Sequence, residues 1–144
     1  MIDAKALIDA LELSPHPEGG WYRETWRGPI NADGRAIGTA ILFLLESSQR
    51  SHWHRVDAHE LWLWQAGDPL ALLIAESNAG PQSRTTLGPE VHSGQLLQAV
   101  VEPGHWQAAE PLGGAAGYTL VSCVVTPGFE FAGFELAPPD WQPG

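Results

Sequence analysis

The spacing of apolar residues changes character once along the chain. Near the N-terminus, apolar side chains recur every three to four positions, Ile2, Leu7 and Leu11 among them, until Ser14-Pro15 ends the pattern. This spacing predicts one short amphipathic helix at the start of the chain. Beyond it, apolar segments of strand length alternate with turn-forming segments. The predicted strands cover residues 21–26, 37–45, 52–56, 61–65, 70–75, 95–101, 106–109 and 118–125.

Gly, Pro, Asn and Asp separate these strands and mark the points where the chain reverses. They cluster at residues 31–34, 67–69, 77–81, 103–104 and 126–128. Many short strands with almost no helix favour an all-β sandwich or barrel, most simply a jelly roll. We expect a single domain over residues 1–137, followed by a poorly anchored C-terminal tail at residues 138–144.

The composition fits this picture and excludes some partners. A chain of 144 residues, 44% of them hydrophobic, can bury a core without disulfides or a structural metal. Its formal net charge of -10 would repel phosphate backbones and anionic membrane surfaces, so we expect neither nucleic acid nor a membrane as partner. There is no signal-like N-terminus, and the longest apolar run, residues 40–45, is too short to span a bilayer. We therefore expect a cytoplasmic protein.

The single cysteine, Cys123, lies inside the apolar run at residues 120–125. A small buried hydrophobic residue is the favoured interpretation there, rather than a nucleophile.

Residues 51–67 contain the highest density of chemically functional side chains. His52 and His54 are one residue apart on a predicted strand, so alternation places both on the same side of the sheet. A turn at residues 57–58 would bring Glu60 alongside them. A histidine near a carboxylate can act as a general acid or base, which makes His54 and Glu60 the candidate catalytic pair.

The same spacing is close to a known family signature. His52-x-His54, then Glu60 and Gly67, resembles the first signature of the cupins, and residues 102–107 resemble the second, with Gln107 where a ligand histidine is usual. Over nearly its whole length the chain resembles one branch, the cupin-5 or DUF985 family. The sequence segments that carry this resemblance are residues 16–25, 41–45, 54–56, 60–62, 66–70, 106–109 and 125–131.

The resemblance implies an RmlC-like cupin jelly-roll barrel with a short N-terminal helix, a homodimer, and a small-molecule pocket inside the barrel. It also implies that the residues at His54, Glu60, Trp62 and Gln107 are typical of the family, whereas the position of His52 varies. In one interpretation His52, His54 and Glu60 bind a divalent transition metal and Gln107 adds a weak oxygen ligand. In the other, the same residues form a polar pocket without metal.

Four further assignments concern ligand binding. Glu24 would add a second carboxylate to the pocket or pair with arginines at the surface. Trp62 would line the pocket and stack on a planar or sugar-like ligand, and His52 and Gln107 complete the predicted ligand-binding set. His16 and His92 are expected at the surface.

Two functional hypotheses follow. The first is an enzyme that acts on a small polar metabolite, sugar-like or a carboxylic acid, through His54 and Glu60 as an acid/base pair or as metal ligands. The second is a non-catalytic ligand-binding or sensing protein that uses the same cavity. Fold alone does not separate them.

Overall fold

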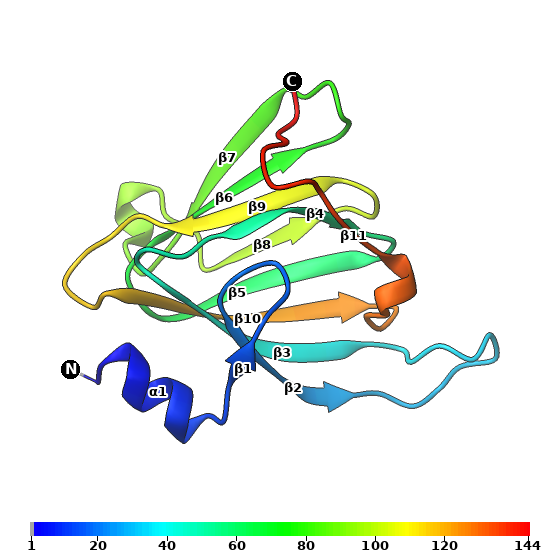
Figure 1. Ribbon diagram of the computed structural model, residues 1–144, viewed down its shortest axis with the longest axis horizontal. Helices are drawn as coiled ribbons and strands as arrows, with labels where there is room; N and C mark the ends of the chain where they lie inside the picture. The colour runs from blue at the N-terminus through cyan, green and yellow to red at the C-terminus, as the bar shows by residue number, and fades with distance from the viewer. Residues whose placement is uncertain (1) are drawn as a thin grey trace.

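The computed structural model describes residues 2–144 and consists mainly of two antiparallel sheets that face each other (Figure 1). The strand order is β1-β2-β3-β10-β5-β8 in one sheet and β11-β4-β9-β6-β7 in the other. The all-β jelly roll predicted from the sequence is confirmed. Among the strands described, the two sheets form a sandwich rather than one continuous barrel. The elements are α1 (Ala4–Ala10), β1 (Ser14–Pro15), β2 (Trp21–Arg27), β3 (Thr39–Glu46), β4 (Ser51–Val56), β5 (His59–Gly67), β6 (Leu70–Ala75), β7 (Gln82–Leu87), η1 (Val91–Ser93), β8 (Gln98–Val101), β9 (Trp106–Pro111), β10 (Tyr118–Thr126), η2 (Phe131–Gly133) and β11 (Phe134–Leu136).

The main core fills one part of the space between the sheets. Phe43 of β3, Trp62 of β5 and Val121 of β10 extend from the first sheet, and Leu72 of β6 meets them from the second. β10 is the central strand, paired with β3 on one side and β5 on the other. Alternating apolar side chains on both sheets therefore bury one face of each strand against the opposite sheet.

The short helix forms where the spacing predicted it. The Asp3 carboxylate caps it by accepting a hydrogen bond from the Ala6 amide at 2.8 Å. Leu7 and Leu11 pack against the cluster that contains Leu44. No helix within residues 2–144 combines the length and apolar character that a bilayer crossing requires.

Two strands that the sequence pattern did not predict lie at the edges of the second sheet. β7 reads Gln-Ser-Arg-Thr-Thr-Leu and pairs only with β6, so half of its residues are exposed and only Leu87 is buried. An edge strand of this kind lacks the apolar alternation on which strand prediction depends. β11, at the other edge, has only three residues.

The C-terminal tail at residues 138–144 is well anchored, so the expectation of a loose tail was wrong. The Trp141 ring lies 4.4 Å from that of Trp106. The Gly144 amide donates to the Asn78 carbonyl at 2.9 Å, and the Gln82 side chain donates to the Pro143 carbonyl at 3.1 Å. Proline and glycine disfavour regular structure here, but one tryptophan supplies enough apolar contact to hold the segment.

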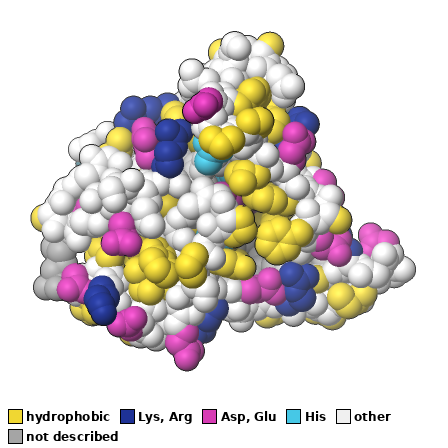
Figure 2. Space-filling model, viewed as in Figure 1, with side chains coloured by type: hydrophobic (Ala, Val, Ile, Leu, Met, Phe, Trp, Pro, Cys, Tyr) yellow, Lys and Arg dark blue, Asp and Glu magenta, His cyan; other side chains and the backbone are white. Residues whose placement is uncertain are grey.

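Several large apolar side chains remain exposed on this chain, including Trp26, Ile30 and Ile37 around the β2–β3 connection. Figure 2 shows apolar side chains gathered in patches on the face presented there, among groups of both charges. The homodimer expected from the sequence stays a prediction.

Candidate functional site

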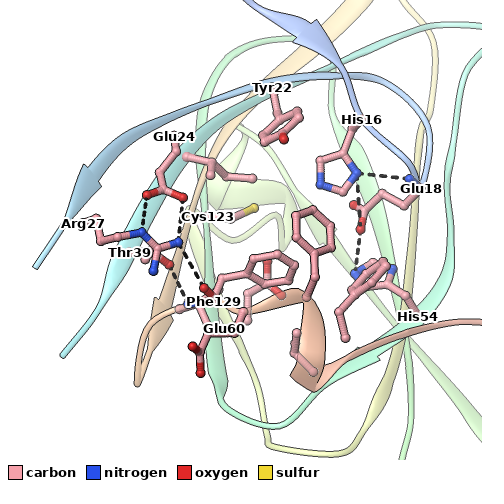
Figure 3. A pocket seen from close by; sticks show the side chains of 16 residues that line it. His16, Glu18, Tyr22, Glu24, Arg27, Thr39, His54, Glu60, Cys123 and Phe129 are labelled. Carbon is pink, nitrogen blue, oxygen red and sulfur yellow. Dashed lines mark hydrogen bonds and ion pairs between the residues drawn. The ribbon is translucent and has the colours of Figure 1, made fainter. Parts of the chain in front are cut away.

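A cavity of about 340 Å³ opens between the two sheets, beyond the main core (Figure 3). β2, β3, β4, β5 and β10 contribute to its walls, together with the segment before β2 and the connection from β10 to β11. The lining residues are His16, Glu18, Tyr22, Glu24, Arg27, Thr39, Ile41, His54, Val56, Glu60, Cys123, Val125, Phe129, Glu130, Phe131 and Phe134.

An irregularity in β4 separates the two histidines that the sequence placed together. Ser51 pairs with Ala109 and His54 with Gln107, so β4 advances three residues while β9 advances two. Such a bulge interrupts the alternation of side chains. His54 consequently lines the cavity, whereas the Nε2 atom of His52 lies 2.8 Å from the Pro138 carbonyl, outside it. The prediction that both imidazoles point to the same side was wrong.

His54 instead meets Glu18, a residue that the sequence analysis did not single out. The His54 Nδ1 atom lies 2.7 Å from the His52 carbonyl oxygen, which can only accept, so Nδ1 carries a proton. In the neutral ring Nε2 is then an acceptor, and it lies 3.1 Å from Oε2 of Glu18. The other carboxyl oxygen of Glu18 accepts a hydrogen bond from the Ser51 hydroxyl at 2.6 Å.

The electrostatics of this pair decide where its proton resides. Burial raises the pKa of Glu18 to about 8. Burial also lowers the pKa of His54, although the nearby Glu60 opposes that effect. At neutral pH Glu18 is therefore protonated, and its O–H group donates a hydrogen bond to Nε2 of His54. The two side chains share one proton inside the cavity.

His16 lines the same side of the cavity, contrary to the expectation of a surface position. Its Nδ1 atom accepts a hydrogen bond from the Glu18 amide at 3.1 Å, so the neutral ring carries its proton on Nε2. Burial lowers the pKa of His16 to about 4, and the positive charge of a protonated His54 acts in the same direction. The ring also packs edge-on against Tyr22, with centroids 4.5 Å apart.

The turn after His16 explains how both residues reach the cavity. Gly19 and Gly20 adopt positive φ angles of 111° and 81°, and a Cβ at Gly19 would collide with the Arg50 carbonyl. The turn thereby packs against the start of β4, where the His52 amide donates to the Glu18 carbonyl at 2.9 Å. Residues 16–20 lie in one of the segments that resemble the family, which is the only sequence feature that pointed to them. No periodic pattern predicts the direction in which the side chains of such a turn point.

Glu60 enters the cavity from β5, as predicted, and two buried side chains behind it fix its orientation. The Trp62 indole donates to Oε1 of Gln107 at 2.7 Å, and Nε2 of Gln107 donates to Oε1 of Glu60 at 3.0 Å. Because an indole N–H can only donate, it determines which end of the Gln107 amide faces Glu60. Trp62 and Gln107 therefore support the carboxyl group and do not line the cavity. The expectation that Trp62 and Gln107 line the pocket was wrong, because the Trp62 ring is buried in the main core and Gln107 is buried behind Glu60.

The pKa of Glu60 is raised to about 7, chiefly by burial, with His54 opposing the shift and Glu18 adding to it. Cys123 is buried, as predicted, and lines the same cavity as Glu60. Burial raises the pKa of Cys123 well above its ordinary value, so the group is a neutral thiol. Glu60 is thus held at a pKa where it can both take up and release a proton.

Glu24 lines another part of the cavity and also forms an ion pair with Arg27, so both placements considered for it occur together. A register shift between Glu24 and Trp26 in β2 turns Glu24 and Arg27 toward each other. The two parallel hydrogen bonds measure 2.8 and 3.0 Å, and Arg27 also donates to the Phe129 carbonyl at 3.1 Å. In Figure 3 this pair lies across the cavity from His16, Glu18 and His54.

Three phenylalanines from the β10–β11 connection and β11 complete the wall. The rings of Phe129, Phe131 and Phe134 pack edge-to-face, with centroids 5.0 to 6.0 Å apart. Arg35 holds this connection in place by donating to the Gly128 carbonyl at 2.7 Å.

The four metal ligands considered in the sequence analysis are not brought together. His52 lies outside the cavity, and the Gln107 amide is committed to Trp62 and Glu60. Within residues 2–144, no group of three or more His, Cys, Asp or Glu side chains has the arrangement that would hold a metal ion. The residues present therefore do not fit the metal centre that the cupin signature implies.

Comparisons with known proteins agree with this fold. A family model described as "Cupin superfamily (DUF985)" matches residues 5–137. A hypothetical protein from Leishmania major is 36% identical, with a TM-score of 0.85 over 94% of this chain and 88% of its own. A protein from Shewanella oneidensis is also 36% identical, with a TM-score of 0.88 over 95% of this chain and 85% of its own.

A more distant solved structure is similar in fold alone. Oxalate decarboxylase from Bacillus subtilis is 13% identical, with a TM-score of 0.62 over 88% of this chain and 30% of its own. A comparison with curated proteins found no match.

Proposed function

Because this chain belongs to the DUF985 family of the cupin superfamily, we propose that the cavity between its two sheets binds a small molecule and carries out proton transfer on it. The observation that carries this proposal is the buried Glu18–His54 pair, in which Nε2 of His54 lies 3.1 Å from Oε2 of Glu18. A structural core gains little from two ionisable groups placed in a cavity, because desolvating them costs free energy. Groups with perturbed pKa values in a cavity are typical of acid/base sites.

The two carboxyl groups take different roles in this proposal. Glu60, with a pKa of about 7, is the base, and Glu18, with a pKa of about 8, is the acid. The substrate class that suits them is a hydroxy-carbonyl compound. Glu60 removes a proton from the carbon next to the carbonyl while Glu18 donates one to the carbonyl oxygen. Glu60 then returns its proton to the former carbonyl carbon while the ionised Glu18 takes the proton of the neighbouring hydroxyl group, which becomes the new carbonyl. The product is an isomer of the substrate, and both glutamates end in their starting protonation states.

His54 and the residues behind Glu60 position these two groups. His54 accepts the Glu18 hydrogen bond and so directs the acidic proton before it is donated. Gln107, oriented by Trp62, donates a hydrogen bond to Oε1 of Glu60, and the second carboxyl oxygen of Glu60 acts as the base. The predicted catalytic pair of His54 and Glu60 thus becomes a set of three with Glu18.

The test is hydrogen exchange on candidate sugars. Aldoses and ketoses are incubated with the protein in D₂O, and loss of the proton next to the carbonyl is followed by ¹H NMR. We expect exchange with at least one sugar and a loss of about 100-fold or more in Glu18→Gln and in Glu60→Gln, the usual contribution of a general acid or base. Glu135→Gln is the matched control, because Glu135 pairs with Arg55 and does not line the cavity.

The alternative function predicts a different result. If a sugar binds but exchanges no proton, or if both cavity variants exchange at the wild-type rate, the acid/base proposal fails. Binding without exchange would favour the non-catalytic ligand-binding protein.

A further inference from the structure

We propose that the ligand of this cavity is a polyhydroxy molecule of about monosaccharide size that carries no negative charge, so that carboxylates and phosphates are rejected. This inference rests on the proposed function, since it names the ligand class for the same cavity. It narrows the two classes considered from the sequence, sugar-like or carboxylic acid, to the first.

The first argument is the balance of charged groups in the cavity wall. Four of the lining residues are glutamates, at positions 18, 24, 60 and 130, and among residues 2–144 only one lining residue, Arg27, is permanently cationic. Both oxygens of Glu24 and the Phe129 carbonyl already accept hydrogen bonds from Arg27. An anionic ligand could reach this guanidinium only by displacing Glu24, which would leave that carboxylate without its partner.

The three other glutamates of the cavity wall, at positions 18, 60 and 130, also offer no favourable binding site for an anionic ligand. Glu130 pairs with Arg35 at 3.4 Å, and Arg35 is itself held by two hydrogen bonds to Asp57. Glu18 and Glu60 are buried and contact neutral partners, namely the Ser51 hydroxyl and the Gln107 amide. At neutral pH Glu18 is protonated and uncharged, whereas Glu60, with a pKa of about 7, is ionised in part. A ligand carboxylate beside Glu60 would therefore meet a like charge where water cannot screen it.

The second argument is the mixture of polar and apolar walls. His16, Glu18 and Glu60 present hydrogen-bonding groups, whereas the phenylalanines at 129, 131 and 134 present apolar ones. Hydroxyl groups on one side of a ligand and C–H groups on the other would match these walls. A volume of about 340 Å³ is at the lower end of the usual range for ligand sites, about 300 to 1,000 Å³, and suits a single sugar ring.

The test compares matched neutral and anionic sugars. Glucose with glucuronate, and galactose with galacturonate, differ by a carboxylate in place of a hydroxymethyl group. Binding is followed by NMR from the indole N–H signal of Trp62, which connects to Glu60 through Gln107 and is assigned with the Trp62→Phe variant. We expect at least one neutral sugar to bind about tenfold or more tightly than its uronate, in titrations up to about 100 mM.

A charge variant sharpens the comparison. Glu24→Gln should free Arg27 and shift the ratio of uronate affinity to neutral-sugar affinity about tenfold toward the uronates. The side chain of Glu24 is 34% exposed, so its replacement should leave the fold intact. Glu12→Gln is the control, since it removes a carboxylate from an arginine pair outside the cavity. Arg27→Met provides an independent test and should weaken uronate binding further.

Each outcome decides the matter. Equal or tighter uronate binding by the wild-type protein overturns the inference and leaves the proposed acid/base function standing. If the ratio of neutral-sugar affinity to uronate affinity is the same in Glu24→Gln, Arg27→Met and the wild type, the charge argument is overturned. If none of the four sugars binds, the ligand class is wrong, and the exchange experiment on other hydroxy-carbonyl compounds decides the proposed function separately.

Discussion

The buried carboxyl of Glu18 should make the folded protein less stable as the pH rises from 6.5 to 8. Its pKa is about 8 in the folded protein against an ordinary value of 4.5, because burial disfavours the charged form. The unfolded chain therefore releases this proton at lower pH than the folded chain does. The stabilisation is complete below pH 4.5 and is lost as the pH rises through 8.

The other buried groups define the window in which this effect can be seen. The pKa of His16 is lowered from 6.5 to about 4, so its contribution has the opposite sign and is lost as the pH falls below 6.5. The pKa of His54 is also lowered, and its contribution has the same sign as that of His16. Above pH 6.5 only the carboxyl groups remain. Glu60, with a pKa of about 7, acts in the same direction as Glu18 over a shorter interval.

The magnitude follows from the width of the window. Each pH unit over which the folded state holds one more proton than the unfolded state is worth about 1.4 kcal/mol. From pH 6.5 to 8, Glu18 therefore accounts for about 2 kcal/mol. Glu60 adds less than about 1 kcal/mol.

Urea unfolding followed by tryptophan fluorescence at both pH values measures this loss. Glu18→Gln is the informative variant, because a glutamine can accept from Ser51 and donate to His54, as the protonated acid does. It should remove the Glu18 contribution, so its free energy of unfolding should fall by about 2 kcal/mol less than that of the wild type between pH 6.5 and 8. Glu135→Gln, at an exposed position, should follow the wild type. A wild-type stability that does not change over this window, or an equal loss in Glu18→Gln, would refute the reasoning.

Three other changes test separate parts of the structure. Trp62→Phe leaves the Gln107 amide without its donor and should cost about 1 to 3 kcal/mol in urea unfolding; a cost below about 0.5 kcal/mol would contradict the role of Trp62 in orienting it. His52→Ala should leave sugar binding and metal content unchanged, because His52 lies outside the cavity; elemental analysis and the NMR titration check this, and a loss of either would return His52 to the site. The exposed Trp26 and Ile37 should lie in a dimer interface, so light scattering should give twice the monomer mass, and Trp26→Glu should halve it; a monomeric wild-type protein at micromolar concentration would contradict the dimer.

Much of the fold was predictable because one physical signal determines it. Strands that bury one face against the opposite sheet must alternate, and β6 was predicted to the residue for that reason. Edge strand β7 was missed because half of its residues are exposed and its sequence has no alternation of apolar residues. Glu60 reached the cavity as predicted because β5 keeps its alternation near that residue.

The rest of the site was not predictable because it depends on backbone irregularities that leave no periodic signal. One bulge turned His52 away, and a glycine turn carried His16 and Glu18 inward. The segments that resemble the family contained His16 and Glu18, but a resemblance assigns a role only where the family has one. The acid/base pair therefore emerged only from the positions of individual side chains.

The bulge in β4 also determines which sequence changes this site can tolerate. The carbonyl of His52 lies within reach of Nδ1 of His54 in the same short segment, so no distant residue is needed to select the tautomer. The number of residues between Ser51 and His54 therefore determines which nitrogen of the His54 ring carries the proton. A deletion of one residue there would move the lone pair that meets Glu18 even if every side chain in the cavity kept its identity. During evolution, this site should tolerate substitution at His52 far better than any change in the length of the strand.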